Sequence, residues 1–433
     1  MHELLCGFEK IKNYNISEDI MSETIKYGSV SSKKAIELEE KYGAHNYHPL
    51  PVVIAKGEGA KVWDPEGKEY FDFLSAYSAV NQGHCHPKIT DALIEQAKTC
   101  ALTSRAFFNN KLGEYEKFIT EFFGFEMILP MNSGAEAVET AMKLSRKWGY
   151  MKKGIPADEA LLVFAKANFH GRTISIISAS TDHTCRVNFG PFVPGIELVE
   201  YDDSEALEQL FKEKGERIAA FIVEPIQGEA GVYVPKDGYL KKCYDICKRH
   251  NVLFVADEIQ TGIARTGKLM ACEWDGVHPD ILLLGKALSG GVYPVSAVLS
   301  SKEIMLCIQP GEHGSTYGGN PVACVVAQAA LQVVKDENLC ERAVELGDYF
   351  RQELKKIDHP MLEQIRGKGL LNAIIIKPKD GKEAWDVCVK LSEKGILCKP
   401  THRHIIRLAP PLVITKEQLA ECIERIKSVF SEM

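Results

Sequence analysis

The sequence predicts an α/β protein with a largely parallel β-sheet in a large domain and a smaller α+β domain at the C-terminal end. Short apolar runs alternate with helical segments through the middle of the chain, a rhythm typical of parallel strands joined by helices. After Pro321 the pattern changes to long helices with few strands, which favours a separate, smaller domain. At 433 residues, the chain is longer than most proteins with a single hydrophobic core, which favours about two to three domains.

The N-terminal part, residues 1–53, is expected to be a lead-in segment that packs with the smaller domain. It is polar, with one helical stretch at Ser31–Tyr42, and the prolines within residues 46–51 favour extended backbone. The apolar alternation in residues 52–74, broken at a Pro-Glu-Gly turn, predicts a β-hairpin that begins the large domain.

The large domain is expected to span residues 54–320. One of its helices should cover Tyr239–His250, and another should follow the small-residue turn at Ser133–Ala135. Its strands are short apolar runs, predicted at Leu161–Phe164, Ile174–Ser178, Ala219–Glu224, Val252–Asp257, Ile281–Leu284 and Ser296–Ser300.

The smaller domain is expected to span residues 321–433. After long helices, we expect strands in the region Ile365–Ile376 and at Ile405–Leu408. A final helix should begin near Lys416.

The charge balance and the apolar pattern exclude several classes of partner. A net charge of −7 and a sequence pI near 6.1, without a basic stripe, argue against nucleic acid or an anionic membrane. No apolar run approaches the roughly twenty residues needed to span a bilayer. Small molecules are therefore the expected partners.

The cysteines and the N-terminus both favour the cytoplasm. The 13 cysteines include no Cys-x-x-Cys pair, which suits free thiols in a reducing compartment. Residues 1–10 resemble neither a signal peptide nor an Arg-rich transit peptide. The tripeptide His84-Cys85-His86 lacks a second ligand pair at zinc spacing, so we expect a packed turn there and no metal site.

A single lysine stands where an apolar strand ends at a glycine, in Asp280-Ile-Leu-Leu-Leu-Gly-Lys286. Burial disfavours the ammonium form and lowers a lysine pKa, which frees the amine to attack an aldehyde such as that of pyridoxal phosphate (PLP). Lys286 is therefore a candidate for covalent attachment of PLP. The alternative is an ordinary surface lysine after a strand, so the other parts of a PLP site decide between them.

Two further segments fit a PLP site. Asp257 ends an apolar strand, at the edge where open α/β sheets gather their ligands, and its carboxylate could pair with the pyridinium nitrogen of PLP. A helix-capping or salt-bridging aspartate is the alternative. Ser133, Gly134 and Ala135 open a helix whose first N–H groups could bind a phosphate, although a plain N-cap explains Ser133 equally well.

Two glycine-rich segments resemble nucleotide-binding motifs but lack essential residues. Gly262–Leu269 fits most of a P-loop, yet Leu269 replaces the Ser/Thr hydroxyl that would hold magnesium. Gly367–Asn372 begins like a dinucleotide fingerprint but lacks its last glycine and runs into a predicted strand instead of a helix. Nucleotide hydrolysis and NAD-dependent oxidation are therefore disfavoured.

With these residues together, the chain resembles the class III PLP-dependent aminotransferases of fold type I, from about Tyr42 to the C-terminus. Within that class, Gly43–Pro51, Leu74–His84 and Val223–Gly231 resemble the ornithine aminotransferases. The resemblance implies a large PLP-binding domain with a mostly parallel, seven-stranded sheet. It also implies a homodimer with shared active sites, or a larger assembly of such dimers.

The same resemblance implies the cofactor-binding residues. Lys286 would attach PLP, Asp257 would pair with its ring nitrogen, and Gln260 would contact the ring oxygen O3′. Phe169 would stack on the ring, and His170, where members of the family often carry a different residue, would lie beside it. The phosphate would be bound by Ser133, Gly134 and Ala135, with Ser315 and Thr316 of the partner subunit.

The substrate-binding residues follow from the resemblance as well. Tyr47 and Arg172 would hold the α-amino and α-carboxylate end of ornithine, while Tyr77 would shape the pocket. Arg407 lies in an apolar strand, where an unpaired guanidinium is costly and a carboxylate is a natural partner, and it would bind the α-carboxylate of 2-oxoglutarate or glutamate. Glu229 would pair with Arg407 and mask it while ornithine is bound. For each arginine, a structural ion pair is the alternative.

The implied activity is that of an ornithine δ-aminotransferase, which moves the δ-amine of ornithine to 2-oxoglutarate and yields glutamate 5-semialdehyde and glutamate. Lys286, Asp257 and Glu229 would be the catalytic residues, with Lys286 as the proton shuttle. The nearest alternatives are acetylornithine and 4-aminobutyrate aminotransferases, against which Tyr47 and Tyr77 argue. A PLP-binding protein without catalysis is a remote alternative, because the catalytic residues are intact.

Overall fold

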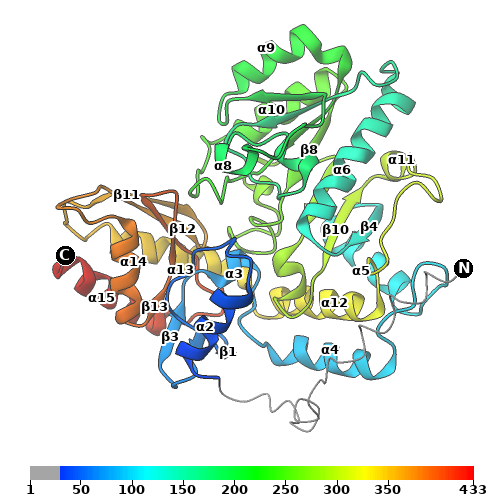
Figure 1. Cartoon of the computed structure of the whole chain (residues 1–433). Helices are drawn as coiled ribbons and strands as arrows, with labels where there is room; N and C mark the ends of the chain where they lie inside the picture. The colour runs from blue at the N-terminus through cyan, green and yellow to red at the C-terminus, as the bar shows by residue number, and fades with distance from the viewer. Residues whose placement is uncertain (1–29) are drawn as a thin grey trace, which may run out of the picture. The chain divides into compact units, whose positions relative to one another are not determined.

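The structure, a computed structural model, describes residues 30–433, which form two compact units (Figure 1). The first unit contains the described residues up to Ala55 together with Asp64–Lys68. Its helix α2 (Ser32–Tyr42) confirms the helix predicted there. Expectations that fall on residues 1–29, among them the absence of a targeting signal, lie outside the described part of the chain.

A small mixed sheet begins the second unit, which contains the rest of the described chain. Strands β1 (Lys56–Glu58), β2 (Lys61–Trp63) and β3 (Glu69–Asp72) are antiparallel, which confirms the predicted hairpin. The fourth strand, β13 (Ile396–Leu397), pairs with β3 in parallel. A strand from the C-terminal region therefore completes a sheet that the N-terminal region begins.

The central sheet consists of seven short strands: β4 (Met127–Met131), β5 (Leu161–Ala165), β6 (Ile196–Val199), β7 (Ile218–Val223), β8 (Leu253–Asp257), β9 (Ile281–Leu284) and β10 (Ser296–Ser300). Their order is β4-β10-β9-β8-β7-β5-β6. The strands from β9 to β6 are parallel, and β10 is antiparallel to both β9 and β4. The predicted largely parallel sheet is confirmed.

The two edge strands, β4 and β6, were not predicted from the sequence. Pro130 lies inside β4 and pairs with Ala297 of β10. A proline argues against a strand in a sequence, yet an edge strand tolerates it, because one side of the strand needs no ladder hydrogen bond. Strand β6 is a four-residue run interrupted by Glu197, too short for an apolar pattern to stand out.

One predicted strand, Ile174–Ser178, is wrong, because Ile174–Ile177 forms the short helix α7. A run this short does not distinguish a strand period from a single helical turn. Ile176 and Ile177 are buried, as a strand would also have required. The Ser178 hydroxyl donates a hydrogen bond to the Ile174 carbonyl at 2.8 Å, a contact that only the helical turn permits.

Helices cover both faces of the central sheet (Figure 1). Alternate residues of a strand point to opposite faces, so each strand contributes side chains to the hydrophobic cores on both sides of the sheet. Ile222 belongs to a buried cluster formed with helix α6 (Gly134–Trp148). Phe254 instead packs edge-on against Tyr244 of helix α10 (Tyr239–Arg249), with ring centroids 5.8 Å apart. The carboxyl ends of the strands are thereby held in a rigid layer.

The C-terminal part of the second unit contains four long helices and an antiparallel sheet. These elements are α12 (Pro321–Asp336), α13 (Leu339–Leu354), β11 (Leu362–Lys368), β12 (Leu371–Ile376), α14 (Ala384–Glu393), β14 (Lys399–Thr401), β15 (Ile405–Leu408) and α15 (Lys416–Ser431). The sheet order is β11-β12-β15-β14. The long helices and both predicted strand regions are confirmed. The domain boundaries after residues 53 and 320 stay predictions.

The remaining helices are short or lie in connections: α3 (Ser75–Ser78), α4 (Pro87–Thr99), α5 (Leu112–Phe123), η2 (Gly149–Lys153), α8 (His183–Arg186), α9 (Ser204–Lys214), η3 (Gly215–Arg217), η4 (Ala271–Asp275), η5 (Lys286–Ser289) and α11 (Lys302–Met305). Within residues 30–433, no helix is both long and apolar enough to cross a membrane. In the same range, His, Cys, Asp and Glu form no group of three or more that could hold a metal ion.

Candidate active site

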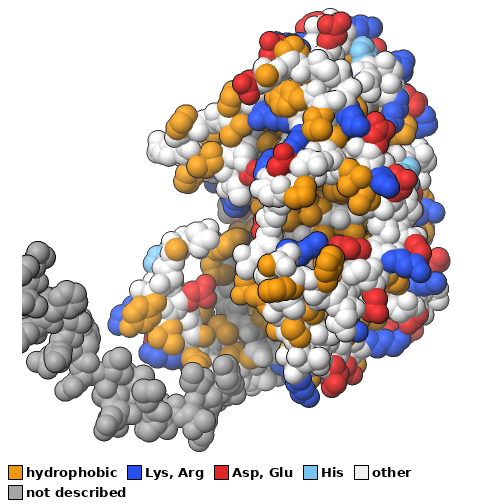
Figure 2. All heavy atoms as spheres, turned by 90° about the vertical axis from the view of Figure 1, so that its right-hand side faces the viewer, with side chains coloured by type: hydrophobic (Ala, Val, Ile, Leu, Met, Phe, Trp, Pro, Cys, Tyr) orange, Lys and Arg blue, Asp and Glu red, His pale blue; other side chains and the backbone are white. Residues whose placement is uncertain are grey.

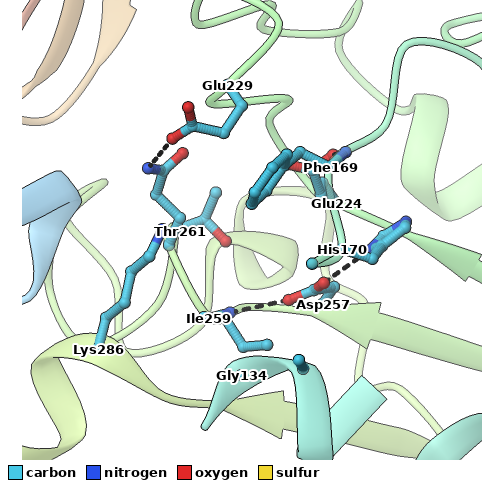
Figure 3. A pocket seen from close by; sticks show the side chains of 12 residues that line it. Gly134, Phe169, His170, Glu224, Glu229, Asp257, Ile259, Thr261 and Lys286 are labelled. Carbon is cyan, nitrogen blue, oxygen red and sulfur yellow. Dashed lines mark hydrogen bonds and ion pairs between the residues drawn. The ribbon is translucent and has the colours of Figure 1, made fainter. Parts of the chain in front are cut away.

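A pocket of about 210 Å³ lies where the parallel strands of the central sheet end (Figure 3). Glu224 follows β7, Asp257 ends β8, and Lys286 comes two residues after β9. Open α/β sheets bind their ligands at this edge. The pocket is lined by Gly134, Ala135, Phe169, His170, Gly171, Glu224, Glu229, Asp257, Ile259, Gln260, Thr261 and Lys286.

Lys286 begins η5 with a left-handed backbone, φ 45°, and its side chain extends into the pocket (Figure 3). Burial lowers the pKa of Lys286, and the nearby Arg407 lowers it further, while Glu229 opposes the shift. The amine is therefore displaced toward its neutral form. A neutral amine is the form that attacks an aldehyde and that accepts a proton.

Asp257 and His170 form a buried pair beneath the pocket. His170 Nδ1 lies 2.6 Å from Asp257 Oδ2, and Asp257 Oδ1 accepts a hydrogen bond from the N–H of Ile259 at 3.1 Å. Burial acts to lower the pKa of His170, but the hydrogen bond and charge of Asp257 outweigh it and raise the pKa. Both carboxylate oxygens are thus held in place, which fixes how the group faces the pocket.

Glu224 is a pocket residue that was not predicted to have a role in the site. Its Oε2 accepts a hydrogen bond from the N–H of Phe169 at 2.9 Å. Burial raises the pKa of Glu224 to about 7, with Asp257 adding to the shift and His170 opposing it. The pattern that singled out Asp257, an acidic residue at the end of a buried strand, would also have identified Glu224 as a candidate site residue.

An ion pair joins β15 to the pocket wall. Arg407 Nη1 donates to Glu229 Oε1 at 2.5 Å, and the Arg407 guanidinium lies 4.9 Å from the centre of the Tyr77 ring. Burial acts to raise the pKa of Glu229, but Arg407 and Lys286 outweigh it and lower the pKa. Arg407 is only 5% exposed, so a carboxylate that replaced Glu229 would meet a desolvated guanidinium.

Gln260 connects this ion pair to the turn that carries Tyr77. Its amide nitrogen donates to Glu229 Oε1 at 3.1 Å and to the Tyr77 carbonyl at 3.3 Å. Gly228 leaves the space for Gln260, since a Cβ atom there would lie 1.4 Å from Gln260 Oε1. That oxygen is buried and has no hydrogen-bond partner among the described residues.

The N-terminus of α6 faces the pocket through Gly134 and Ala135. Ser133 caps the helix, because its hydroxyl accepts a hydrogen bond from the N–H of Glu136 at 3.2 Å and its own N–H donates to the Glu136 carboxylate at 2.8 Å. Ser133 therefore acts as a helix N-cap, which was the alternative to phosphate binding considered for this residue. The N–H groups in the first turn of a helix lack intrahelical acceptors, so Gly134 and Ala135 can receive an anion.

Phe169 and Arg172 lie on the loop after β5. The Arg172 guanidinium is 5.4 Å from the centre of the Phe169 ring, and its Nη1 donates to Cys185 Sγ at 3.4 Å. Phe169 lines the pocket, whereas Arg172 is exposed beside it. Arg172 can therefore be reached by a solute without opening the buried part of the site.

Seven of the predicted site residues do not line this pocket: Tyr47, Tyr77, Ser133, Arg172, Ser315, Thr316 and Arg407. Tyr47 is 65% exposed and belongs to the first unit. Ser315 accepts a hydrogen bond from Asn132 Nδ2 at 2.7 Å, and Thr316 beside it is exposed. Their roles toward substrate and partner subunit stay predictions.

The pocket residues fit PLP by their chemistry. The cofactor needs an amine, an anion for its ring nitrogen and donors for its phosphate, and Lys286, Asp257 and the α6 N-terminus supply them. One buried polar atom of the pocket lining, Gln260 Oε1, has no partner among the described residues. Buried polar groups are normally satisfied, so this atom favours a polar ligand in the pocket.

Comparisons with known proteins agree with this chemistry. The family model for aminotransferase class-III matches residues 42–430. The mitochondrial ornithine aminotransferase of Drosophila melanogaster is 60% identical over 395 residues, covering 91% of this chain and 91% of that protein. The acetylornithine aminotransferase of Elizabethkingia anophelis has a TM-score of 0.85 at 57% identity, covering 94% of this chain and 100% of that chain.

A structure of ornithine aminotransferase from Toxoplasma gondii, with PLP at partial occupancy in its active site, has a TM-score of 0.92. It is 48% identical, and the alignment covers 96% of this chain and 97% of that chain. The match to the family model begins at Tyr42, where the sequence resemblance begins. Because that match extends over most of the sequence and the fold agrees throughout, the chain belongs to the class-III aminotransferase family.

Proposed function

We propose that this chain is a PLP-dependent aminotransferase that takes the δ-amine of ornithine and passes it to 2-oxoglutarate. The products are glutamate 5-semialdehyde and glutamate. The observation that carries the proposal is the Glu229–Arg407 ion pair on a pocket that also holds Lys286. The similarity to ornithine aminotransferases over nearly the whole chain supports it.

When bound, PLP supplies an aldehyde that captures the amine of the substrate and a ring that takes up electrons from a breaking C–H bond. Asp257 would hold a proton on the ring nitrogen, and its pairing with His170 keeps the carboxylate oriented for this. Lys286 would take a proton from the substrate carbon that carries the amine and deliver one to the former aldehyde carbon of the cofactor, on the other side of the shared nitrogen. Its lowered pKa favours the neutral amine that this transfer requires.

The Glu229–Arg407 pair accounts for the two substrates of the proposed reaction. With ornithine, Glu229 would stay on Arg407, so that the pocket offers no free cation to a cationic substrate. With glutamate or 2-oxoglutarate, the α-carboxylate would take the place of Glu229 on Arg407. Arg172, exposed next to Phe169, would bind the α-carboxylate of ornithine.

N-Acetylornithine is the competing substrate, because the Elizabethkingia relative is an acetylornithine aminotransferase. The deciding experiment is a single-turnover absorbance assay of the PLP-loaded protein with ornithine, N-acetylornithine and 4-aminobutyrate, with mass spectrometry of the products. Ornithine should bleach the cofactor band fastest and yield glutamate 5-semialdehyde. A faster reaction with N-acetylornithine would reassign the substrate, and no bleaching by any of the three amines would exclude transamination.

We further propose that the active protein is a homodimer. Phe107 and Phe108 are 74% and 105% exposed, and exposed apolar residues of this size favour a protein interface. Apolar side chains also gather in patches between charged ones on the face shown in Figure 2. Sedimentation velocity should give twice the mass of the chain, and a monomer at micromolar concentration would contradict the proposal.

We also propose a cytoplasmic location. The twelve cysteines among residues 30–433 are all free thiols, which suits a reducing compartment. The Drosophila relative is a mitochondrial protein, so the location needs a direct test. Fractionation of cells that express the whole chain should recover it with cytoplasmic markers, and recovery with mitochondrial markers would overturn the proposal.

A further inference from the structure

Arg265 is the largest fully buried side chain in the described part of the chain, and the proposed chemistry does not use it. It lies in the loop after β8, within the segment Gly262–Leu269 that resembles a P-loop but lacks its hydroxyl. Ile263 and Ala264 adopt left-handed backbone, with φ 53° and 71°. Such conformations are costly for residues with a Cβ atom, so the loop is held in this shape by its surroundings.

The guanidinium of Arg265 connects three separate segments. Its Nε and Nη2 donate to Asn81 Oδ1 at 3.0 and 2.6 Å. Its Nη1 donates to the carbonyls of Leu370 and Pro410 at 3.1 and 2.7 Å. Leu370 lies in the turn between β11 and β12, and Pro410 lies two residues after β15. One side chain therefore ties the central sheet to the sheet that carries Arg407.

The same network reaches the residues on both sides of the pocket. Asn81 accepts a hydrogen bond at its carbonyl from the N–H of Leu412, at 2.8 Å, in the segment that follows Arg407. The next residue, Gln82, donates to the carbonyl of Ala287 at 2.9 Å, directly after Lys286. The positions of Lys286 and Arg407 are thus coupled through one buried polar cluster.

Burial of the charged Arg265 guanidinium costs folding free energy, which indicates that this side chain does more than fill space. All four side-chain hydrogen bonds of Arg265 go to neutral oxygen atoms. Burial lowers the pKa of Arg265 to about 9, with Asp72 opposing the shift. A buried charge without a close counter-ion is less favourable than a well-packed apolar side chain, unless its geometry is needed.

We propose that Arg265 is a positioning residue that holds Arg407 at the separation from Lys286 that a dicarboxylate substrate requires. The inference rests on the proposed function, in which Arg407 binds the α-carboxylate of glutamate or 2-oxoglutarate. It predicts that loosening Arg265 weakens dicarboxylate binding while the covalent attachment of PLP at Lys286 is retained. A residue with a general structural role would weaken both or neither.

The test is calorimetric titration of the PLP-loaded protein with glutarate, a five-carbon dicarboxylate that cannot react. In Arg265→Lys, the shorter and non-planar cation cannot reach all three acceptors, and the Kd of glutarate should rise about tenfold. The absorbance band of bound PLP should stay at its wild-type position. The matched control is Arg351→Lys, because Arg351 also donates to neutral oxygens of the same hairpin, Gly369 O and Asn372 Oδ1, both at 2.6 Å.

A second variant keeps the test decisive if Arg265→Lys does not fold. Asn81→Ala removes two of the four acceptor contacts of Arg265 and should raise the Kd of glutarate in the same direction. Equal glutarate affinity in wild type and both variants would overturn the positioning role, as would an equal loss in Arg351→Lys. Failure of the wild-type protein to bind glutarate would instead contradict the assignment of Arg407 in the proposed function.

Discussion

At the scale of single residues, the charged groups at the pocket are of two kinds: those that neutralise each other and those that can exchange protons. Glu229 and Arg407 are of the first kind, because they form an ion pair. Lys286 and Glu224 remain as buried titratable groups whose pKa values move toward neutrality, downward for the lysine and upward to about 7 for the glutamate. Such displaced groups in a cleft are typical of catalytic sites.

The first prediction concerns Lys286. In Lys286→Ala, PLP should still bind through the α6 N-terminus and Asp257, but without covalent attachment, and turnover should fall by at least about a hundredfold because the general base is lost. Borohydride reduction followed by peptide mass spectrometry measures the attachment independently of activity. Labelling of another lysine in the variant would show that the assignment of Lys286 is wrong.

The second prediction concerns the masking of Arg407. In Glu229→Ala the guanidinium is permanently open, so the glutamate half-reaction should gain about tenfold relative to the ornithine half-reaction. Single-turnover absorbance gives both rates. Glu312→Ala, which removes an exposed ion pair with Lys147, is the control and should leave the ratio unchanged. An unchanged ratio in Glu229→Ala would make Glu229 a structural carboxylate.

The third prediction concerns Glu224 and pH. Its carboxyl keeps a proton up to pH about 7 in the folded protein, whereas its ordinary pKa is 4.5. The folded state therefore binds more protons between these values, and the free energy of unfolding falls as pH rises through the window, by about 3 kcal/mol. The raised pKa of His170 acts in the same direction but is present in both proteins compared.

Glu224→Gln removes this pH dependence, because the amide can still accept the hydrogen bond from the Phe169 N–H but cannot ionise. Urea unfolding of the cofactor-free protein at pH 5 and pH 8 measures it. The variant should gain stability relative to wild type as the pH increases. Parallel pH curves for the two proteins would mean that Glu224 is ionised in the fold.

At the scale of elements, the most unusual feature is the turn α3, Ser75–Ser78, in which all four residues have positive φ, from 45° to 72°. Left-handed backbone costs about 1–2 kcal/mol for each residue with a Cβ atom. Asp72 Oδ1 accepts the N–H of Ser75 at 2.9 Å, and the Ser75 hydroxyl donates to the Ala409 carbonyl at 2.6 Å. The strained turn places the Tyr77 ring against Arg407.

The fourth prediction follows from this strain. Ala76 is exposed with φ 45° and ψ 46°, so Ala76→Gly loses little packing and relieves the backbone, and it should raise the free energy of unfolding by about 1 kcal/mol. Ala79, with φ −84° and ψ −28°, is the matched control, and Ala79→Gly should destabilise the protein by about 0.5–1 kcal/mol. Equal destabilisation in urea titrations of both variants would argue against strain at this turn.

At the scale of the whole molecule, the pocket of one chain does not contain every residue expected at the phosphate. Thr316 is exposed and does not line the pocket of its own chain. In the proposed homodimer its hydroxyl would reach the phosphate held by the partner subunit. The protein should then retain PLP only while the homodimer is assembled.

The fifth prediction tests this dependence. Dilution below the dimer dissociation constant should release PLP, and Thr316→Val should weaken PLP binding by roughly tenfold through the loss of a hydrogen bond to a charged group. Thr316→Ser keeps the hydroxyl and is the control. Gel filtration with absorbance detection measures retention, and a monomer that keeps its full complement of PLP would contradict the shared site.

The sequence alone was sufficient for the features that neighbouring residues encode. Four of the five parallel strands of the central sheet, the long C-terminal helices and the hairpin at residues 52–74 were predicted from runs and periods within single elements. Lys286 and Asp257 could be singled out for the same reason, since each follows an apolar strand at the edge where such sheets bind ligands. Both side chains do lie in one pocket, while their catalytic roles stay predictions.

Only the tertiary structure revealed the features that depend on distant parts of the chain. The helix at Ile174–Ile177, the burial that raises the pKa of Glu224, and the ties that Arg265 makes to the C-terminal sheet were absent from any local pattern. A pKa or a buried hydrogen bond is determined by what surrounds the group in space. Those neighbours lie up to hundreds of positions away in the sequence, so no window of adjacent residues contains the information.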